Sequence, residues 1–512
     1  MPLLQKRLEQ ISFWLLYLWG QLYFIRDGGA YLLDGKVIGY SWYNYIRQAW
    51  LIERRISRHY NYFREPLYGG LVAEFGEITG SYANIAILVS SIAGSLAALV
   101  LGKIVWQIFP RNGGFWGGFA SLSMFLVAGY LPIGRWGNHY TLLVLAMMLV
   151  FWRLFRSIHT SAGWGWLALS LGFAASVDQR SAPWLLVAIM FSLFFSRDWK
   201  WRSLNSIILI IGSFGIPRFW RWYFSDDSSH RLSTTAILNF QREVVSRWSL
   251  GEINSRTEAC SQVPLEDYLQ IGFFGTDCSW EILKVNWLED IPSFTLFPVM
   301  WIFPVLGILF FVVLSKRCSV FFGHWALLAG IVGSVVFWSL IMPLPTRYLP
   351  SVCIGLCLVV PFALATIEPL KKPFFQWLLR LGTLGVVLQY SYTSPDMFAM
   401  RKNLKRQVDE QERYWRIWQI VKAYRGGGSF LDCSEMGFNS LMLPERYVSQ
   451  PFHQLRNSSF CQEWIENGSG EWMLLKMDSS LGYKMESQEM WKSQYHFQEG
   501  NLSLWKYEGP KQ

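Results

Sequence analysis

Long runs of apolar residues recur along most of the chain and constrain its fold more than any other feature. A helix needs about 20 mostly apolar residues to cross the roughly 30 Å hydrocarbon core of a bilayer. Hydrophobic residues make up 52% of the 512 residues and charged residues only 16%, against roughly a quarter charged in an average globular protein. This composition excludes a disordered or fibrous chain and argues against a soluble enzyme of this size.

The runs predict a membrane all-α fold with about eleven transmembrane helices. Several runs are shorter than a full span, which leaves re-entrant pairs as an alternative for neighbouring ones. The runs cover residues 11–25, 83–107, 115–133, 140–152, 163–177, 183–196, 204–222, 296–314, 320–342, 349–367 and 374–392.

Lysine and arginine alternate between the short loops, and this alternation predicts the orientation of the chain. If the N-terminus with Lys6 and Arg7 is cytoplasmic, every second loop should be basic, and it is. We therefore expect an integral protein of a bacterial inner membrane with a cytoplasmic N-terminus. The net charge of +10 then reflects basic loops near anionic lipids rather than nucleic-acid binding. The basic loops carry Arg111, then Arg153 and Arg156, then Arg197, Lys200 and Arg202, then Lys316 and Arg317, then Lys371 and Lys372.

Three larger segments fall on the outer face in this orientation. Segments 26–82 and 223–295 are loops of a polytopic domain that covers residues 1–392, and the first should hold juxtamembrane helices. Residues 393–428 predict an amphipathic basic stalk and a glycine linker, although their basic run would also fit an error in the last span. Residues 429–512 predict a small α/β outer domain, with strand-like pieces such as 472–476.

The cysteines occur as one pair in each of two outer segments. Cys260 and Cys278 share the loop 223–295, and Cys433 and Cys461 share the C-terminal domain. An oxidising compartment would allow a disulfide within each pair. Chance would also give this distribution.

Asp27 is the first candidate for catalysis, because it stands at the membrane–water boundary after the first span. A carboxylate at the edge of a partly desolvated cavity can keep a raised proton affinity and act as a general base. The alternative is a solvated aspartate that helps to end the helix.

Other polar residues gather at the predicted outer ends of the spans. His139 lies in a polar and aromatic hairpin, and Asp178 and Arg180 follow the fifth predicted span, where they could simply pair with each other. Arg347, beside Tyr348, could grip a lipid phosphate through its guanidinium fork or merely reach the headgroups. Metal-ligand spacing, a Walker loop, a serine elbow and a nucleotide-binding glycine fingerprint are all absent from the sequence.

Taken together, these motifs resemble the GT-C polytopic glycosyltransferases, in particular the protein O-mannosyltransferase and aminoarabinose-transferase group. The segment Glu65-Pro66-Leu67-Tyr68, followed by Phe75-Gly76 and Ser81-Tyr82-Ala83, is similar to that group's Pro-Pro-Leu-Tyr block. The order of an outer aspartate, this turn, an arginine-bearing hairpin, the edge 345–350 and a C-terminal outer domain strengthens the resemblance.

The resemblance implies transfer of a sugar from a polyprenyl-phosphate-linked donor to a protein, lipid or glycan acceptor at the outer face, with inversion. It also implies roles for individual residues. Asp27 would be the catalytic base, with Asp34 as the second candidate because Gly28 stands where the group has a glutamate. Donor phosphate binding would fall to Arg347, Tyr348, Arg135 and Arg180, and the acceptor or sugar cavity to Arg64, Glu65, His139 and Asp178.

Two other classes of protein compete with this hypothesis. A secondary transporter would show internal repeats and charged helices at the bilayer midplane, and the sequence has no repeat of fixed period. A non-catalytic membrane scaffold would tolerate replacement of the charges at the outer rim. The sequence specifies no cofactor; some GT-C enzymes use a divalent cation, and nothing in the sequence fixes one.

Overall fold

A computed structural model of the chain describes its helical part up to residue 224, one later helix and much of the C-terminal portion. The described residues are 2–28, 49, 52, 66–79, 82–109, 111–126, 139–160, 162–178, 181–196, 198–224, 373–393, 430–433, 471–477, 479–498 and 501–509, with scattered residues within 357–368, 416–424 and 461–466. The predicted spans 296–314 and 320–342 lie outside these residues, and 349–367 does so almost entirely.

Each of the other eight predicted spans coincides with a helix. Among the described residues, Asn84–Ile108, Tyr140–Ile158 and Trp199–Phe224 are long and apolar enough to cross a bilayer, and two further apolar helices are shorter. The protein is therefore an integral membrane protein, and the count of eleven spans stays a prediction. The eight helices are α1 (Pro2–Gly28), α4 (Tyr82–Ile108), α5 (Gly113–Leu126), α7 (Tyr140–Thr160), α8 (Trp164–Val177), α9 (Ala182–Phe195), α10 (Trp199–Phe224) and α18 (Pro373–Thr393).

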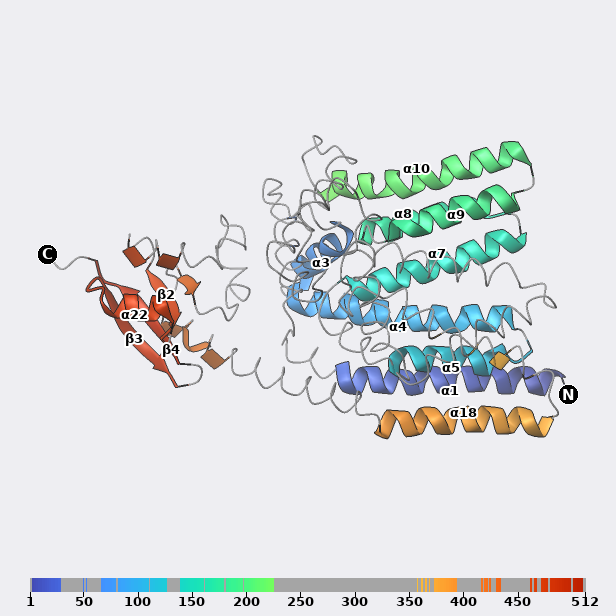
Figure 1. The fold of residues 1–512 in the computed structure, drawn as a ribbon, viewed down its shortest axis with the longest axis horizontal. Coiled ribbons are helices and arrows are strands. Elements are labelled where there is room, and N and C mark those ends of the chain that lie inside the picture. Colours follow the sequence, from blue (N-terminus) through green and yellow to red (C-terminus); the bar gives the residue numbers. More distant parts are fainter. Residues whose placement is uncertain are drawn as a thin grey trace, which may run out of the picture.

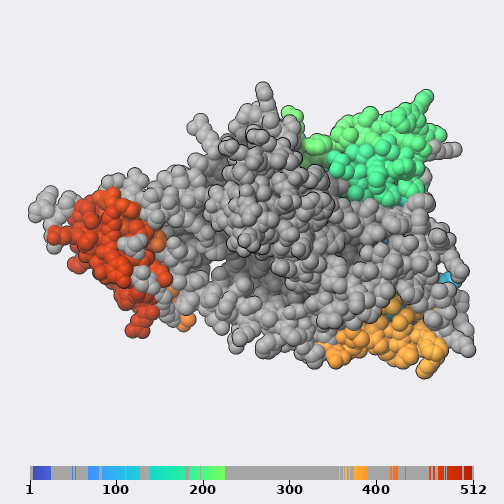
Figure 2. Space-filling model, in the orientation of Figure 1, coloured from blue at the N-terminus to red at the C-terminus, as the bar shows by residue number. Residues whose placement is uncertain are grey.

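These helices lie side by side in a bundle (Figure 1). The short helix α3 (Pro66–Thr79) caps the bundle at the end where α1 finishes, which we call the α3 end. The end where α1 begins is called the opposite end. α18 lies at the surface along one edge of the molecule, and α9 and α10 lie at the other edge (Figure 2).

Small residues let α4 and α5 approach each other closely. A Cβ atom added to Gly117 of α5 would lie 2.3 Å from the carbonyl oxygen of Gly102 on α4. All residues of α5 are buried. Apolar helices gain no hydrophobic driving force from pairing within lipid, so close backbone approach and polar contacts hold such bundles together.

A buried arginine joins the first and last of these helices at the opposite end. Arg380 of α18 places Nη2 2.6 Å from Oε1 of Glu9 on α1, and Nε 2.7 Å from Oε1 of Glu368. The side chains of Arg380, Glu9 and Glu368 are only 12%, 6% and 2% exposed. Buried charges of this kind persist when they are paired and hydrogen-bonded.

The remaining carboxylate oxygens of this cluster also accept hydrogen bonds. Oε2 of Glu9 accepts from the backbone N–H of Phe115 at 2.8 Å, in the first turn of α5. Oε2 of Glu368 accepts from Nδ2 of Asn112 at 2.9 Å and from Nε1 of Trp116 at 2.5 Å. We call these six residues the Arg380 network, which ties α1, α5 and α18 together.

The C-terminal portion forms a four-stranded sheet that Figure 1 shows beyond the α3 end of the bundle. The strands are β1 (Phe430–Cys433), β2 (Trp472–Lys476), β3 (Trp491–Phe497) and β4 (Leu502–Tyr507), in the spatial order β1-β2-β4-β3. β1 pairs with β2 in parallel, and the other pairs are antiparallel.

Both faces of this sheet are covered by apolar side chains. Trp472 and Leu474 of β2 pack with Ile417 and Val421 on one face. Met473 and Leu475 point to the other face, because side chains alternate along a strand, and pack there with a cluster that includes Met485 of α22 (Ser480–Glu486). This burial on both faces explains why the first four residues of β2 are all apolar.

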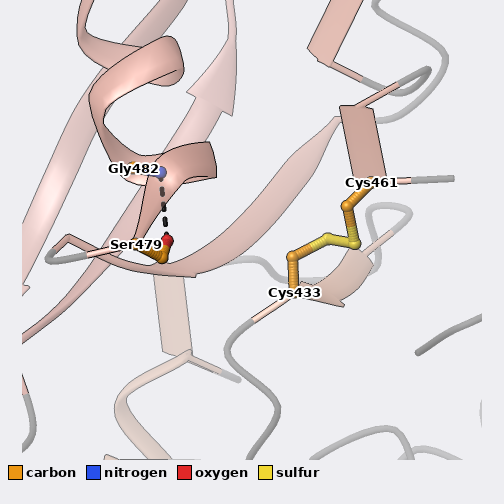
Figure 3. The surroundings of a disulfide bond; sticks show 4 residues. All are labelled: Cys433, Cys461, Ser479 and Gly482. Carbon is orange, nitrogen blue, oxygen red and sulfur yellow. Dashed lines mark hydrogen bonds between the residues drawn. A yellow bond between two sulfur atoms is a disulfide. The ribbon is translucent and has the colours of Figure 1, made fainter. Parts of the chain in front are cut away.

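A disulfide between Cys433 and Cys461 fastens β1 to the segment 461–466 (Figure 3). Their Cα atoms are 6.0 Å apart, and both residues are buried. Nearby, the Ser479 hydroxyl accepts a hydrogen bond from the backbone N–H of Gly482 at 3.1 Å and so caps α22. The other predicted pair, Cys260 and Cys278, lies outside the described residues.

Replacing Arg380 with glutamine should strongly destabilise the bundle. The change leaves two buried carboxylates without their cation, which costs about 3–5 kcal/mol. Thermal unfolding in detergent would measure the loss. Arg218→Gln, at an exposed position on α10, is the matched control and should change stability by no more than about 0.5 kcal/mol. Equal effects of the two changes would contradict the structural role of the network.

Removing the disulfide should loosen the C-terminal portion selectively. Cys433→Ala together with Cys461→Ala opens a loop with a sequence separation of 28 residues, which costs about 3–4 kcal/mol in the chain-entropy account. Limited proteolysis of the full-length protein should then cut within residues 430–509 faster than in the native protein. Reductant should accelerate cleavage of the native protein in the same region and leave the variant unchanged.

Candidate functional site

The candidate site lies at the α3 end of the bundle, where α1, α8 and α10 finish and α4, α7 and α9 begin. Asp27 lies in the last turn of α1, which ends at Gly28. The sequence predicted the end of this helix just before Asp27, so the helix is slightly longer than expected. Asp27, His139 and Asp178, which the sequence analysis selected, all lie at this end of the fold.

Tyr68 fixes α3 onto α4. Its side chain is fully buried, and its hydroxyl donates to the carbonyl oxygen of Ala86 at 2.8 Å and lies 2.9 Å from Oγ of Ser90. Burial raises the pKa of the Tyr68 phenol well above its usual range, because a buried phenolate would lose its hydration. The hydroxyl thus stays protonated and available as a donor at any physiological pH.

The same point of α4 also holds the beginning of α7. The Thr141 hydroxyl donates to the Ser90 carbonyl oxygen at 2.7 Å, and both residues are buried. Two polar contacts therefore converge on Ser90, one from α3 and one from α7. In an apolar bundle such contacts specify which helix faces meet.

His139 and Asp178 form a close pair across two helices. Nε2 of His139, directly before α7, lies 2.5 Å from Oδ2 of Asp178, which caps the C-terminal end of α8. His139 is 3% exposed and the Asp178 side chain is 14% exposed. The backbone N–H and the hydroxyl of Ser181 both donate to the Asp178 carbonyl oxygen, at 3.2 and 2.9 Å, and hold the turn.

This pair has a definite chemical capacity. A carboxylate that accepts from one imidazole nitrogen fixes the orientation and tautomer of the ring. A histidine held in this way can position a polar substrate group or exchange a proton with it. Within the part of the chain that the structure describes, no group of three histidine, cysteine or acidic residues could hold a metal ion.

α10 closes the site against α3 through a glycine. A Cβ atom added to Gly70 would lie 2.1 Å from the ring of Phe224, the last residue of α10. Phe224 is buried and stacks on Trp220 at 5.7 Å. The absence of a side chain at position 70 is therefore what allows α10 to reach α3.

The structure brings together only some of the residues that the sequence selected. His139 and Asp178 meet, and Asp27 lies at the same end of the bundle. The contacts of Tyr68, Ser90 and Thr141 were not anticipated, although Tyr68 belongs to the Glu65–Tyr68 block. The remaining selected site residues lie outside the described residues; they are Asp34, Arg64, Glu65, Arg135, Arg180, Arg347 and Tyr348.

Comparison with solved structures places this arrangement among known folds. ArnT from Cupriavidus metallidurans bound to undecaprenyl phosphate aligns with a TM-score of 0.58 and 14% identity, over 96% of this chain and 97% of that chain. The apo state of the same protein aligns with a TM-score of 0.61 and 13% identity, over 97% and 98%. The Archaeoglobus fulgidus oligosaccharyltransferase AglB, in complex with an inhibitory peptide and a dolichol phosphate, aligns with a TM-score of 0.50 and 13% identity, over 93% and 71%.

These similarities show that the chain has the fold of the GT-C glycosyltransferases, which confirms the resemblance noted in the sequence at the level of fold. No protein-family profile matches the sequence, and no curated protein matches it. The fold is thus shared over nearly the full length of ArnT at low sequence identity.

Gly70→Ala should destabilise the α3 end of the bundle. The new methyl group meets the ring of Phe224, and overpacking of this kind costs about 1–3 kcal/mol. Gly165→Ala in α8 is the matched control, because an added Cβ has nothing within 4 Å there and alanine favours a helix by up to about 1 kcal/mol. In thermal unfolding in detergent, Gly70→Ala should therefore lower the melting temperature, whereas Gly165→Ala should raise it. A stable Gly70→Ala protein would contradict the close approach of α3 and α10.

Proposed function

We propose that this protein is a membrane glycosyltransferase that moves a sugar from a polyprenyl-phosphate-linked donor to an acceptor hydroxyl or amine at the outer face of the membrane. The observation that carries the proposal is the placement of Asp27, α3 and the His139–Asp178 pair at one end of a GT-C fold. The bound lipid phosphates of ArnT and AglB in the aligned structures support the class of donor.

The chemistry of such a donor explains why no nucleotide site is needed. The phosphate of the lipid is already a good leaving group at the anomeric carbon. In the proposed reaction the acceptor oxygen or nitrogen forms a bond to that carbon while the bond from the carbon to the phosphate oxygen breaks. A single displacement inverts the anomeric configuration, and the polyprenyl phosphate departs.

Asp27 is the proposed base. Its carboxylate would take the proton of the acceptor hydroxyl or amine as the new bond forms, which is general-base catalysis. Asp34 is the second candidate for this role. The donor phosphate would be held by Arg347 and Tyr348 with Arg135 and Arg180, whose cationic groups offset the charge that develops on the leaving phosphate.

The His139–Asp178 pair serves in this proposal as a wall of the sugar or acceptor cavity. Its near-complete burial and its fixed imidazole suit it to orient a sugar hydroxyl. Arg64 and Glu65, which precede α3, are proposed for the same cavity. The outer-face location follows from the predicted cytoplasmic N-terminus, because α1 would then end outside.

The direct test is sugar transfer by full-length protein in membranes, with a panel of radiolabelled polyprenyl-phosphate sugars as donors. Asp27→Asn should reduce the rate by at least about 100-fold if the carboxylate is the base. Asp198→Asn makes the same chemical change at an exposed position at the opposite end of the bundle and should leave the rate unchanged.

Each result of this assay distinguishes one hypothesis from another. Transfer that survives in Asp27→Asn and disappears in Asp34→Asn would assign the base to Asp34. Transfer that survives in both variants would sink the proposed mechanism. Failure of the native protein with every donor and acceptor would favour a non-catalytic scaffold built on the same fold.

A second prediction concerns the His139–Asp178 pair. Asp178→Asn removes the charge that orients the imidazole while keeping its size, so we expect transfer to slow by about 10-fold or more. Purification yield and thermal midpoint should remain close to those of the native protein. A loss of stability that matches the loss of activity would instead assign the pair a purely structural role.

A further inference from the structure

A row of cations and aromatic rings crosses four helices near the opposite end of the bundle, away from the candidate site. It begins on α1 and α4. Nζ of Lys103 lies 5.1 Å from the ring centroid of Trp14, 4.4 Å from that of Trp106 and 4.6 Å from that of Phe13. A lysine enclosed by several rings is held by their electron-rich faces.

The row continues across α4 to α7 and α8. Gln107, one helical turn after Lys103, accepts a hydrogen bond from Nε1 of Trp152 at 2.8 Å. Cζ of Arg153 lies 4.9 Å from the Trp152 ring and 5.4 Å from the ring of Trp166 on α8. The two groups of contacts are therefore one helical turn apart along α4. We call this set the cation–aromatic stripe, with the members Trp14, Lys103, Trp106, Trp152, Arg153 and Trp166.

The stripe is accessible from the lipid rather than buried between helices. Trp14 is 38% exposed and Trp166 is 61% exposed, Lys103 is exposed, and Arg153 is half-buried. Lys103 lies five residues before the end of α4, which is about 7–8 Å at 1.5 Å per residue. With the end of α4 at the membrane surface, this depth would correspond to the boundary between acyl chains and headgroups, where tryptophan side chains concentrate.

In the described part of the chain, the two cations contact aromatic rings rather than carboxylates. Within the part of the chain that the structure describes, neither Lys103 nor Arg153 is paired with a carboxylate, and each has only ring contacts. Two positive charges at the lipid boundary without an anionic partner attract anionic headgroups. The neighbouring aromatic rings would hold each cation in place and carry no formal negative charge that would neutralise it.

We propose that the cation–aromatic stripe binds anionic phospholipid of the leaflet at the opposite end, with Lys103 and Arg153 as the two cations that attract the headgroup phosphate. By the distribution of basic loops this leaflet is the cytoplasmic one. The occupant is a headgroup phosphate with a net negative charge, because a zwitterionic headgroup carries its own cation. The stripe is separate from the α3 end, so this site neither uses nor depends on the proposed sugar transfer.

Native mass spectrometry of the full-length protein tests this proposal. The protein, released from detergent, is offered equal amounts of phosphatidylglycerol and phosphatidylethanolamine with identical acyl chains. The native protein should retain phosphatidylglycerol preferentially. Lys103→Gln combined with Arg153→Gln should lower its retention by about 10-fold or more, since each cation near an anionic surface contributes about 1 kcal/mol and 1.4 kcal/mol is tenfold.

A matched pair of substitutions separates a specific site from diffuse charge. Arg156→Gln combined with Lys200→Gln removes two exposed charges from the same end of the bundle and should leave the preference intact. Equal losses in the two double variants would overturn the proposal in favour of diffuse attraction. Absence of any preference in the native protein would overturn it outright.

A single aromatic substitution tests whether misfolding, rather than a lost contact, explains reduced lipid retention. Trp166→Leu keeps every charge and changes a side chain that is 61% exposed, so the fold should persist. The change removes one of the two ring contacts of Arg153, and we expect retention of phosphatidylglycerol to fall about threefold, as loss of a contact worth about 0.5–1 kcal/mol would produce. Unchanged retention in Trp166→Leu would overturn the part that the Trp166 ring plays in lipid binding.

Discussion

The contact between Arg380 and two buried glutamates is the interaction on which the described bundle depends most. Glu9 and Arg380 are separated by 371 positions in the sequence, so the contact closes the helical part of the chain on itself. The outer side of α18 is apolar and exposed, with Phe374, Trp377 and Leu381 each more than half exposed. Because lipid solvates such a surface as well as another helix does, apolar packing alone would not fix the position of α18.

This constraint bears on both the candidate site and the C-terminal portion. α1 carries Glu9 of the Arg380 network near its start and Asp27 in its last turn, so its axial position determines where the proposed base lies. α18 begins beside the same network and leads toward the C-terminal portion. The polar contacts of Tyr68, Ser90 and Thr141 play the corresponding role at the α3 end. The bundle is thus specified by polar contacts at its two ends and by close backbone approach, as at Gly102 and Gly117.

The chemical difference between the two ends of the bundle has a physical basis. A membrane enzyme that uses a lipid-linked donor needs its reactive groups at a lipid boundary and a rigid scaffold beneath them. The His139–Asp178 pair is 14% exposed or less, which gives it a drier environment than a free surface pair. At the other end, Lys103 and Arg153 rest on aromatic rings and face lipid. The two ends therefore present different chemistry to the two leaflets.

Much of the helical architecture could be predicted from the sequence, because the length of an apolar run is set by the thickness of the bilayer. The runs 83–107 and 374–392 differ from α4 and α18 by only one residue at each end. α10 begins earlier than its run, at Trp199, because its first turn carries Lys200 and Arg202, which apolar content cannot reveal. The strand-like piece 472–476 is β2, whose side chains are apolar on both faces.

The long-range contacts could not be predicted in the same way. His139 and Asp178 were both selected, but their pairing depends on how α7 and α8 pack, which no local pattern encodes. Arg380 is a charge inside a predicted span, and such a residue usually signals a buried partner. Its partners Glu9 and Glu368 lie near the ends of other segments, where a charge is unremarkable. Spacing along the chain carries no information about contacts of this kind.

The most direct test of the account is to locate the lipid phosphate on the protein. Full-length protein in nanodiscs would be labelled with an undecaprenyl phosphate that carries a photoreactive diazirine on the isoprene unit nearest the phosphate, and the labelled peptides would be mapped. The account predicts labels at the α3 end, in α3 and the first turns of α4 and α7, and their suppression by unlabelled undecaprenyl phosphate. Absence of labels from the α3 end, or labelling there that the unlabelled lipid does not suppress, would contradict it.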